Sequence, residues 1–179
     1  MKLVQKYNAL LPAIQCVYQN LSRTSSKEIV FDIDDTLIFD DNRKKPTVNA
    51  QIIALLTYLH KMGYKIHLVT ARLDDEEMRQ VTNDELTKIK IPKWDSLSLC
   101  PEMYRESGVT ISKWKASCRQ RVKPVALSVG DQWSDLIILQ NEEHFDFLDS
   151  YHNVEKYPWV VIEPEDGITF LGLKLMDPK

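Results

Sequence analysis

Three aspartates interrupt an otherwise apolar stretch in the first quarter of the chain. In "FDIDDTLI", residues 31–38, Asp32, Asp34 and Asp35 lie among residues expected in a core. Two like charges ~4 Å apart at an effective dielectric constant of ~20 repel each other by about 4 kcal/mol. A chain that keeps such charges together usually provides a cation for them or uses them in chemistry. Because residues two apart in an extended segment point the same way, Asp32 and Asp34 can address one centre.

Two further apolar runs end in polar residues. "IHLV" is followed by Thr70 and Arg72, and "VALSV" by a glycine and Asp131. If these runs are parallel strands, their carboxyl ends share the sheet edge at which α/β folds bind ligands. Asp32, Asp34 and Asp131 offer the hard oxygen ligands that suit a Mg²⁺ ion retaining several waters. Thr70 adds a hydroxyl donor for a phosphate oxygen, so the set predicts Mg²⁺-dependent phosphate chemistry.

The spacing of apolar residues predicts strands alternating with helices. Helices are expected over 1–20 with an interruption at Pro12, 48–59, 73–89, 112–122 and 134–140. Strands are expected over 29–34, 64–70, 94–100, 124–129, 158–163 and 167–175, with a short extended piece at 108–111 and a turn at 163–167 joining the last two strands as a hairpin. Several strands are continuous apolar runs, which is typical of a parallel sheet covered on both faces.

These elements predict one α/β domain over residues 1–179. We expect a three-layer α/β/α sandwich with a Rossmann-like parallel sheet, divided into an N-terminal helical segment (1–25), a core with the polar motifs (26–140) and a C-terminal hairpin (141–179). A helix and a strand fill the segment between Asp32 and Thr70, so no large cap domain fits there. The site is therefore expected to be open, unless a homo-oligomer covers it.

The composition is that of an ordinary globular protein. Of 179 residues, 44% are hydrophobic and 27% are charged, and the net charge is −3. That balance gives no reason to expect a nucleic-acid footprint over the whole surface, and no apolar run reaches the length of a membrane span. Cys16, Cys100 and Cys118 are few and widely spaced, which favours free thiols in a reducing compartment. We expect a cytoplasmic protein without membrane contact.

The motifs "FDIDDTL", "LVTAR" and "VGDQWSD", with a lysine between the last two, resemble those of the haloacid dehalogenase (HAD) superfamily of phosphotransferases. The longer pattern from "VTARLDDEE" to "VGDQWSDLI" is similar to the acid phosphatase branch, subfamily IIIB, which holds the class B and plant acid-phosphatase-like proteins. The likeness runs from about Ile29 to Leu139. It implies a HAD-type sheet and a phosphomonoester hydrolase.

The resemblance also implies a role for each motif residue. Asp32 matches the nucleophile that becomes an aspartyl phosphate, and Asp34 matches the general acid and base. The Asp32 carboxylate, the Asp34 main-chain carbonyl and Asp131 would hold Mg²⁺. Thr70 would donate to the transferring phosphoryl group. Asp135 would support the waters of the metal or orient the lysine.

Two lysines fit the position between the second and last motifs. The family favours a lysine at the start of a helix, often with an arginine four residues later. Lys115 with Arg119 has that spacing, whereas Lys113 directly follows "VTIS". We prefer Lys115 and keep Lys113 as the alternative. Either would offset negative charge that builds on the phosphoryl oxygens.

Two site residues have simpler interpretations. Arg72 could contact the substrate or form a surface ion pair with Asp74 or Asp75. Thr70 could cap the helix that follows it.

The function predicted from the sequence is a Mg²⁺-dependent phosphomonoesterase acting through an aspartyl phosphate. An alternative substrate class is a nucleotide or a phosphorylated polynucleotide end. An alternative outside enzymes is a phosphate- or metal-binding protein on the same fold, which the presence of both Asp32 and Asp34 disfavours.

Overall fold

The computed structural model describes residues 4–39, 47–139, 141, 143–152, 156, 159–162 and 171–175. Its centre is a 7-stranded sheet with the order β1-β8-β9-β7-β2-β5-β6. The strands are β1 (Val4–Tyr7), β2 (Glu28–Phe31), β5 (Lys65–Leu73), β6 (Ser96–Cys100), β7 (Val125–Gly130), β8 (Trp159–Ile162) and β9 (Leu171–Leu175).

The sheet is mostly parallel. β2 pairs in parallel with β5 and β7, and β5–β6 and β7–β9 are also parallel pairs. Only β8, between β1 and β9, runs antiparallel to both of its neighbours. The predicted Rossmann-like α/β fold is confirmed. The turn expected at 163–167 lies outside the described residues, but the two strands it was expected to join do pair.

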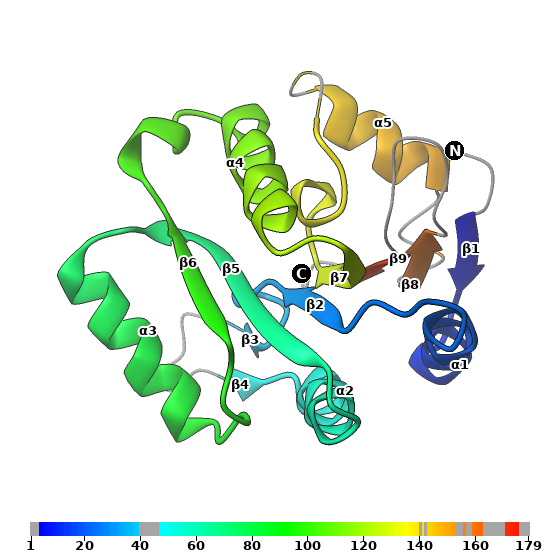
Figure 1. Ribbon diagram of the computed structural model, residues 1–179. Helices are drawn as coiled ribbons and strands as arrows, with labels where there is room; N and C mark the ends of the chain where they lie inside the picture. Colours follow the sequence, from blue (N-terminus) through cyan, green and yellow to red (C-terminus); the bar gives the residue numbers. More distant parts are fainter. Residues whose placement is uncertain are drawn as a thin grey trace.

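Helices cover both faces of the sheet (Figure 1). α1 (Leu10–Leu21), α2 (Ala50–Lys61) and α3 (Glu76–Lys88) lie on one face, and α4 (Gly108–Arg121) and α5 (Glu143–His152) lie on the other. Side-chain caps define where three of them begin: Asn49 accepts from Ile52 N at α2, Asp75 from Met78 N at α3, and Ser107 from Thr110 N at α4. Each cap satisfies a backbone N–H that has no partner within its helix.

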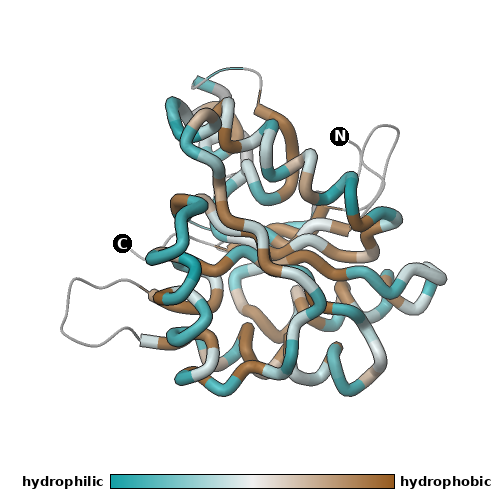
Figure 2. The backbone as a smooth tube through the Cα atoms, turned by 60° about the vertical axis from the view of Figure 1, so that its left-hand side comes forward, coloured by the Kyte–Doolittle hydropathy of each residue, from teal (hydrophilic) through white to brown (hydrophobic). Residues whose placement is uncertain are grey.

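Side chains of the strands pack into apolar layers on both faces of the sheet. Figure 2 shows hydrophobic strands crossing the centre of the molecule. In β2, Ile29 and Phe31 join the cluster that includes the buried faces of α1 and α2, whereas Val30 joins the cluster that includes Trp114 of α4. Strand side chains alternate between faces. Asp32, one residue beyond β2, is therefore expected on the α4 side of the sheet, as Val30 is.

Two predicted elements are wrong at the N-terminus and before α4. Residues 4–7 form β1, because they pair with β8 at the edge of the sheet and this tertiary contact outweighs their helical spacing. Residues 108–111 belong to α4, since Ser107 and Thr110 form a capping box that starts the helix there.

The predicted helix over 134–140 is also wrong. The described residues hold only a 3₁₀ turn, η2 (Trp133–Asp135). In a helix, Leu139 N would donate to Asp135 O, but Leu139 N donates to Ser112 Oγ at 3.0 Å. Asp135 O instead accepts from Arg119 Nη1 at 2.8 Å and from Ser128 Oγ at 2.7 Å. Tertiary hydrogen bonds thus use the groups that would have continued the helix.

The described residues of the connections near the site form only short elements. Between β2 and α2 the described residues form only the pair β3 (Ile38–Phe39) and β4 (Thr47–Val48). The 3₁₀ turn η1 (Glu102–Tyr104) connects β6 toward α4. Among the described residues no helix is long and apolar enough to cross a bilayer.

Candidate active site

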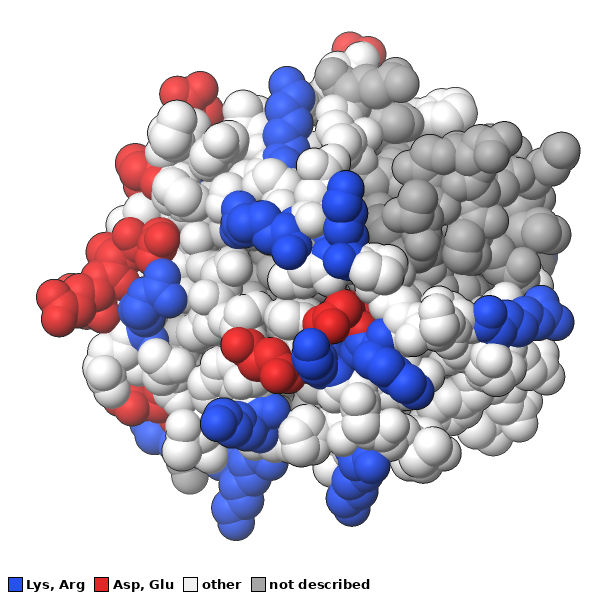
Figure 3. Space-filling model, viewed as in Figure 1, with Lys and Arg blue, Asp and Glu red and all other residues white. Residues whose placement is uncertain are grey.

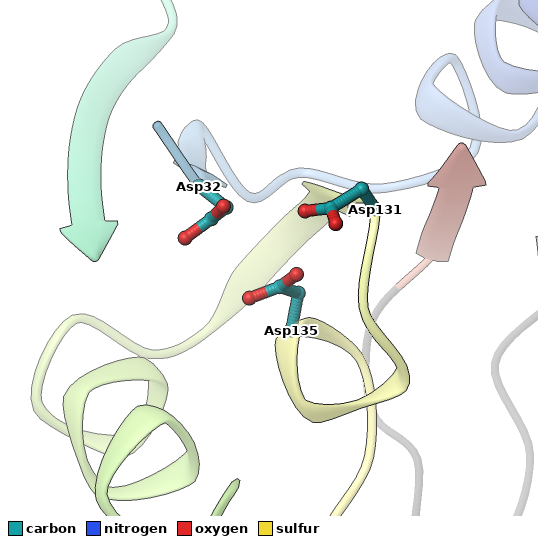
Figure 4. Close-up of side chains that lie close together, drawn as sticks. All are labelled: Asp32, Asp131 and Asp135. Atoms are coloured by element: carbon teal, nitrogen blue, oxygen red, sulfur yellow. The ribbon is translucent and has the colours of Figure 1, made fainter. Parts of the chain in front are cut away.

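Three aspartates from separate segments meet at the carboxyl edge of the sheet. Asp32 follows β2, Asp131 follows β7, and Asp135 lies in η2; Figure 4 shows their carboxylates directed toward one region. One carboxylate oxygen from each lies within 4.8 Å of the others, and all three side chains are buried. Asp32 N donates to Val129 O at 2.9 Å, which extends the β2–β7 ladder and fixes the backbone there. The sheet itself therefore places two of the acids.

Thr36 sets the position of Asp131. Its hydroxyl donates to Asp131 Oδ1 at 3.2 Å and accepts from Asp131 N at 3.1 Å. Gln132 Nε2 donates to Asp131 Oδ2 at 2.9 Å. Thr36 was not among the residues predicted for the site, although a threonine directly after the acidic pair in "DDTL" was a usable signal.

Lys115 is the cation of the cluster. Its Nζ donates to Asp32 Oδ1 at 2.8 Å and also to Asp135 Oδ1, and its side chain is 4% exposed. Lys113, two residues earlier on α4, is exposed. Of the two lysines that the sequence left open, the structure brings Lys115 to the aspartates. Arg119, one turn later, donates to the carbonyl of Asp135 and so ties η2 to α4.

Negative charge exceeds positive charge in this buried cluster. Burial, followed by repulsion from Asp135, raises the pKa of Asp32 to about 8, although Lys115 opposes the shift. Burial lowers the pKa of Lys115, but Asp135 and Asp32 outweigh it and raise that pKa above its ordinary value. Three carboxylates face the Lys115 ammonium and, beside Asp135, the buried Arg119 guanidinium. The acids still outnumber the cations by one, which favours a further cation. Hard oxygen donors in such a set fit a divalent ion such as Mg²⁺.

Gly130 makes room for Asp135. A Cβ atom at this position would lie 2.2 Å from Asp135 Oδ2. The same oxygen accepts from Gln132 N at 3.0 Å, which holds the carboxylate against the backbone. A residue larger than glycine would therefore displace Asp135 from Lys115.

The side chain of Asp34 is not part of the three-acid cluster. Its carboxylate accepts from Thr70 Oγ1 at 2.9 Å and from Arg72 Nη2 at 2.7 Å. Thr70 is completely buried in β5. The cap of α3 is Asp75, so the alternative interpretation of Thr70 as that cap is wrong.

Arg72 pairs with Asp34 and Glu85, and its expected surface partners are engaged elsewhere. Arg72 Nη1 donates to Glu85 Oε2 at 2.6 Å. Asp74 pairs with Arg79, whereas Asp75 caps α3. No pattern in the sequence singled out Glu85, because it lies on a polar helix among several other acids.

The comparisons with known proteins identify the family. Residues 39–149 match the family model of the HAD superfamily, subfamily IIIB (acid phosphatase). This match covers more than half of the chain, which therefore belongs to that family. The matched range includes Thr70, Lys115, Asp131 and Asp135 and begins after Asp32. No curated protein sequence matches the chain.

Solved structures share the fold at low sequence identity. The class C acid phosphatase from Bacillus anthracis is 14% identical, with a TM-score of 0.59 over 93% of this chain and 74% of that one. A chain of a Pnkp1/Rnl/Hen1 complex is 20% identical, with a TM-score of 0.52 over 68% of this chain and 45% of that one. A chain in a second structure, that of the Pnkp1/Rnl/Hen1 RNA repair complex, is 19% identical, with a TM-score of 0.52 over 75% of this chain and 42% of that one. The chain thus spans less than half of the matched chains from those complexes.

Proposed function

We propose that the protein is a Mg²⁺-dependent phosphomonoesterase that forms an aspartyl phosphate on Asp32. Membership of the acid phosphatase family supports hydrolysis of a phosphate ester. The observation that carries the finer proposal is the position of Asp32, buried against Lys115 and grouped with Asp131 and Asp135. A carboxylate held in this way resembles an activated nucleophile more than a structural ion pair.

The reaction would proceed in two displacements. A carboxylate oxygen of Asp32 forms a bond to phosphorus while the bond to the leaving oxygen breaks, and Asp34 gives that oxygen a proton. Water then attacks phosphorus, the bond to Asp32 breaks, and Asp34 accepts the proton of the water. Lys115 holds Asp32 and offsets charge on the phosphoryl oxygens. Thr70, which donates to Asp34 in the structure, would turn its hydroxyl to a phosphoryl oxygen.

The metal and the remaining site residues complete the proposal. Asp32, Asp131 and the Asp34 carbonyl would hold Mg²⁺, which when bound neutralises charge on the phosphate and the carboxylates. Asp135 orients Lys115 through their ion pair. Arg72 stays a proposed substrate contact, although in the structure its guanidinium faces Asp34.

Turnover of an aryl phosphate tests the assignment. Wild type and Asp32→Asn are assayed with p-nitrophenyl phosphate, with and without Mg²⁺. We expect Mg²⁺-dependent hydrolysis by the wild type and a loss of more than ~1000-fold in the variant, as for removal of a covalent nucleophile. Equal rates would remove Asp32 from the mechanism. Binding of Mg²⁺ and phosphate with no turnover of any ester would instead support the non-enzymatic alternative.

A nucleotide or a phosphorylated polynucleotide end is the second candidate substrate. It is favoured by the fold likeness to chains of an RNA repair complex. On the face drawn in Figure 3, basic side chains of the described residues are interspersed with acidic ones, so that face forms no continuous basic stripe. Nucleoside monophosphates and 3′-phosphorylated oligonucleotides, compared with the aryl phosphate, separate the two candidates.

Three other expectations also stay proposals: the single-domain division over 1–179, the cytoplasmic location and a homo-oligomer that covers the site.

A further inference from the structure

Arg72 lies between two carboxylates from different elements. Its Nη2 donates to Asp34 Oδ1 at 2.7 Å, and its Nε contacts Asp34 Oδ1 and Oδ2 at 3.0 and 3.1 Å. Its Nη1 donates to Glu85 Oε2 at 2.6 Å and to Thr82 Oγ1 at 3.1 Å. The planar guanidinium is thus held along both edges, and the Arg72 side chain is only 14% exposed.

The two ends of this chain of contacts differ in how firmly they are fixed. Thr82 and Glu85 are three residues apart on α3 and so share one face of the helix. Thr82 is fully buried, and α3 also buries Leu86 in the main core. Asp34 follows β2, and its side chain is 41% exposed. The helix therefore supplies the fixed end, and the half-exposed carboxylate is the group that is held.

We propose that Glu85, with Thr82, is a positioning residue of the active site: it fixes Arg72, which in turn orients the Asp34 carboxyl group for proton transfer to the leaving oxygen. The inference rests on the proposed function and extends it to α3, from which no site residue was expected. A general acid must come within ~2.6–3.2 Å of the oxygen that it protonates. Displacement of such a group by ~1 Å can lower a rate by about 100-fold.

The dependence of the rate on the leaving group gives the sharpest test. Wild type, Glu85→Gln and the matched control Asp84→Asn are compared with an aryl phosphate, which has a good leaving group, and with glycerol phosphate, which has a poor one. Asp84 is the exposed neighbour of Glu85 and contacts Gln80 instead of Arg72. Both substitutions remove one negative charge from the same turn of α3, but only Glu85→Gln changes a partner of Arg72.

A misplaced acid lowers the rate most for the poor leaving group, because that oxygen must receive its proton as its bond to phosphorus breaks. For Glu85→Gln we expect kcat/KM to fall about tenfold or more with glycerol phosphate and by less than about threefold with the aryl phosphate. Inhibition by inorganic phosphate should stay within about twofold of wild type, and Asp84→Asn should match wild type throughout. Equal losses on both substrates, a change confined to phosphate inhibition, or no loss would overturn the proposal.

A second measurement reads Arg72 without turnover. In ¹⁵N-correlated spectra, the Nε–H signal of Arg72, assigned by its absence in Arg72→Lys, should exchange slowly with water in wild type. The signal should broaden or exchange faster in Glu85→Gln and stay unchanged in Asp84→Asn. If wild type hydrolyses no ester, the proposed function fails, and an unchanged signal in Glu85→Gln then also rejects the positioning role. If wild type is active and this signal is unchanged, only the role of Glu85 is wrong.

Discussion

Strands β2 and β5 carry charged residues at both ends, and the two ends are built differently. At the amino edge, Glu28 of β2 contacts two groups of β5: its Oε1 lies 3.2 Å from Lys65 Nζ, and its Oε2 lies 2.6 Å from His67 Nε2. His67 Nδ1 contacts Ser96 Oγ on β6 at 2.7 Å. At the carboxyl edge, the same β2 leads to Asp32, which is grouped with Asp131 and Asp135 and pairs with the Lys115 ammonium.

Charge balance and exposure separate the two clusters. At the amino edge, burial acts to raise the pKa of Glu28, but hydrogen bonds from His67 and Lys65 outweigh it and lower that pKa. The Lys65 side chain is 59% exposed, so solvent screens its ion pair with Glu28. At the carboxyl edge, burial and repulsion raise the pKa of Asp32. A structural cluster satisfies its charges, whereas the candidate site keeps an excess that a bound cation and a substrate would use.

The largest expected effect follows from removal of the cation at the carboxyl edge. Lys115→Met leaves Asp32 and Asp135 buried and close together without their ammonium. We expect activity to be lost and the free energy of unfolding to fall by about 3–5 kcal/mol, as for a broken buried ion pair. Urea denaturation measures the change. Adding Asp135→Asn should recover part of the stability but none of the activity, and Lys65→Met at the amino edge should cost less than ~1 kcal/mol. Comparable losses for the two lysine variants would break the comparison.

The response to Mg²⁺ should also differ between the two ends. A ligand that binds only the folded protein at 100 times its Kd stabilises it by about 2.7 kcal/mol, which for this size is roughly 5–10 °C in Tm. We expect such a rise with MgCl₂ in thermal denaturation of wild type. Asp131→Asn should abolish most of the rise, whereas Glu28→Gln should retain it. A rise that survives Asp131→Asn would place the ion elsewhere.

The parts that were predictable from sequence are those set by local pattern. The buried run of β7 and the carboxylates at strand ends follow from periodicity and from the geometry of parallel sheets. The helices predicted over residues 4–7 and 134–140 are not formed, because described residues there bind distant partners, β8 in one case and Ser112 of α4 in the other. Glu85 was unpredictable for the same reason, since its partner Arg72 is brought to it only by the packing of α3.

Crowding at Gly130 gives a third, moderate effect. A methyl group there would overlap the Asp135 carboxylate, so Gly130→Ala should cost about 1–3 kcal/mol in unfolding free energy. Activity should fall as well, because Asp135 would move from Lys115. Gly172→Ala is the matched control: the nearest atom to its Cβ would be Leu136 Cδ2 at 3.4 Å, which is ordinary contact. Both variants are compared by urea denaturation and by kcat for an aryl phosphate, and equal outcomes would mean that the close approach of Asp135 is unimportant.

The smallest effect is expected at the amino edge and depends on pH. Since the pKa of Glu28 is lower in the folded protein than in the unfolded chain, its carboxylate stabilises the fold above the unfolded value near 4.5. That contribution disappears as pH falls through the folded pKa, because the protonated acid no longer attracts Lys65 and His67. Glu28→Gln should therefore lower stability by about 0.5–1 kcal/mol at pH 7 and by progressively less below pH ~4.5. Its kcat should equal that of wild type. A pH-independent difference in urea denaturation would mean that Glu28 acts by packing, and a loss of activity would link the two ends of the strands that we have treated as separate.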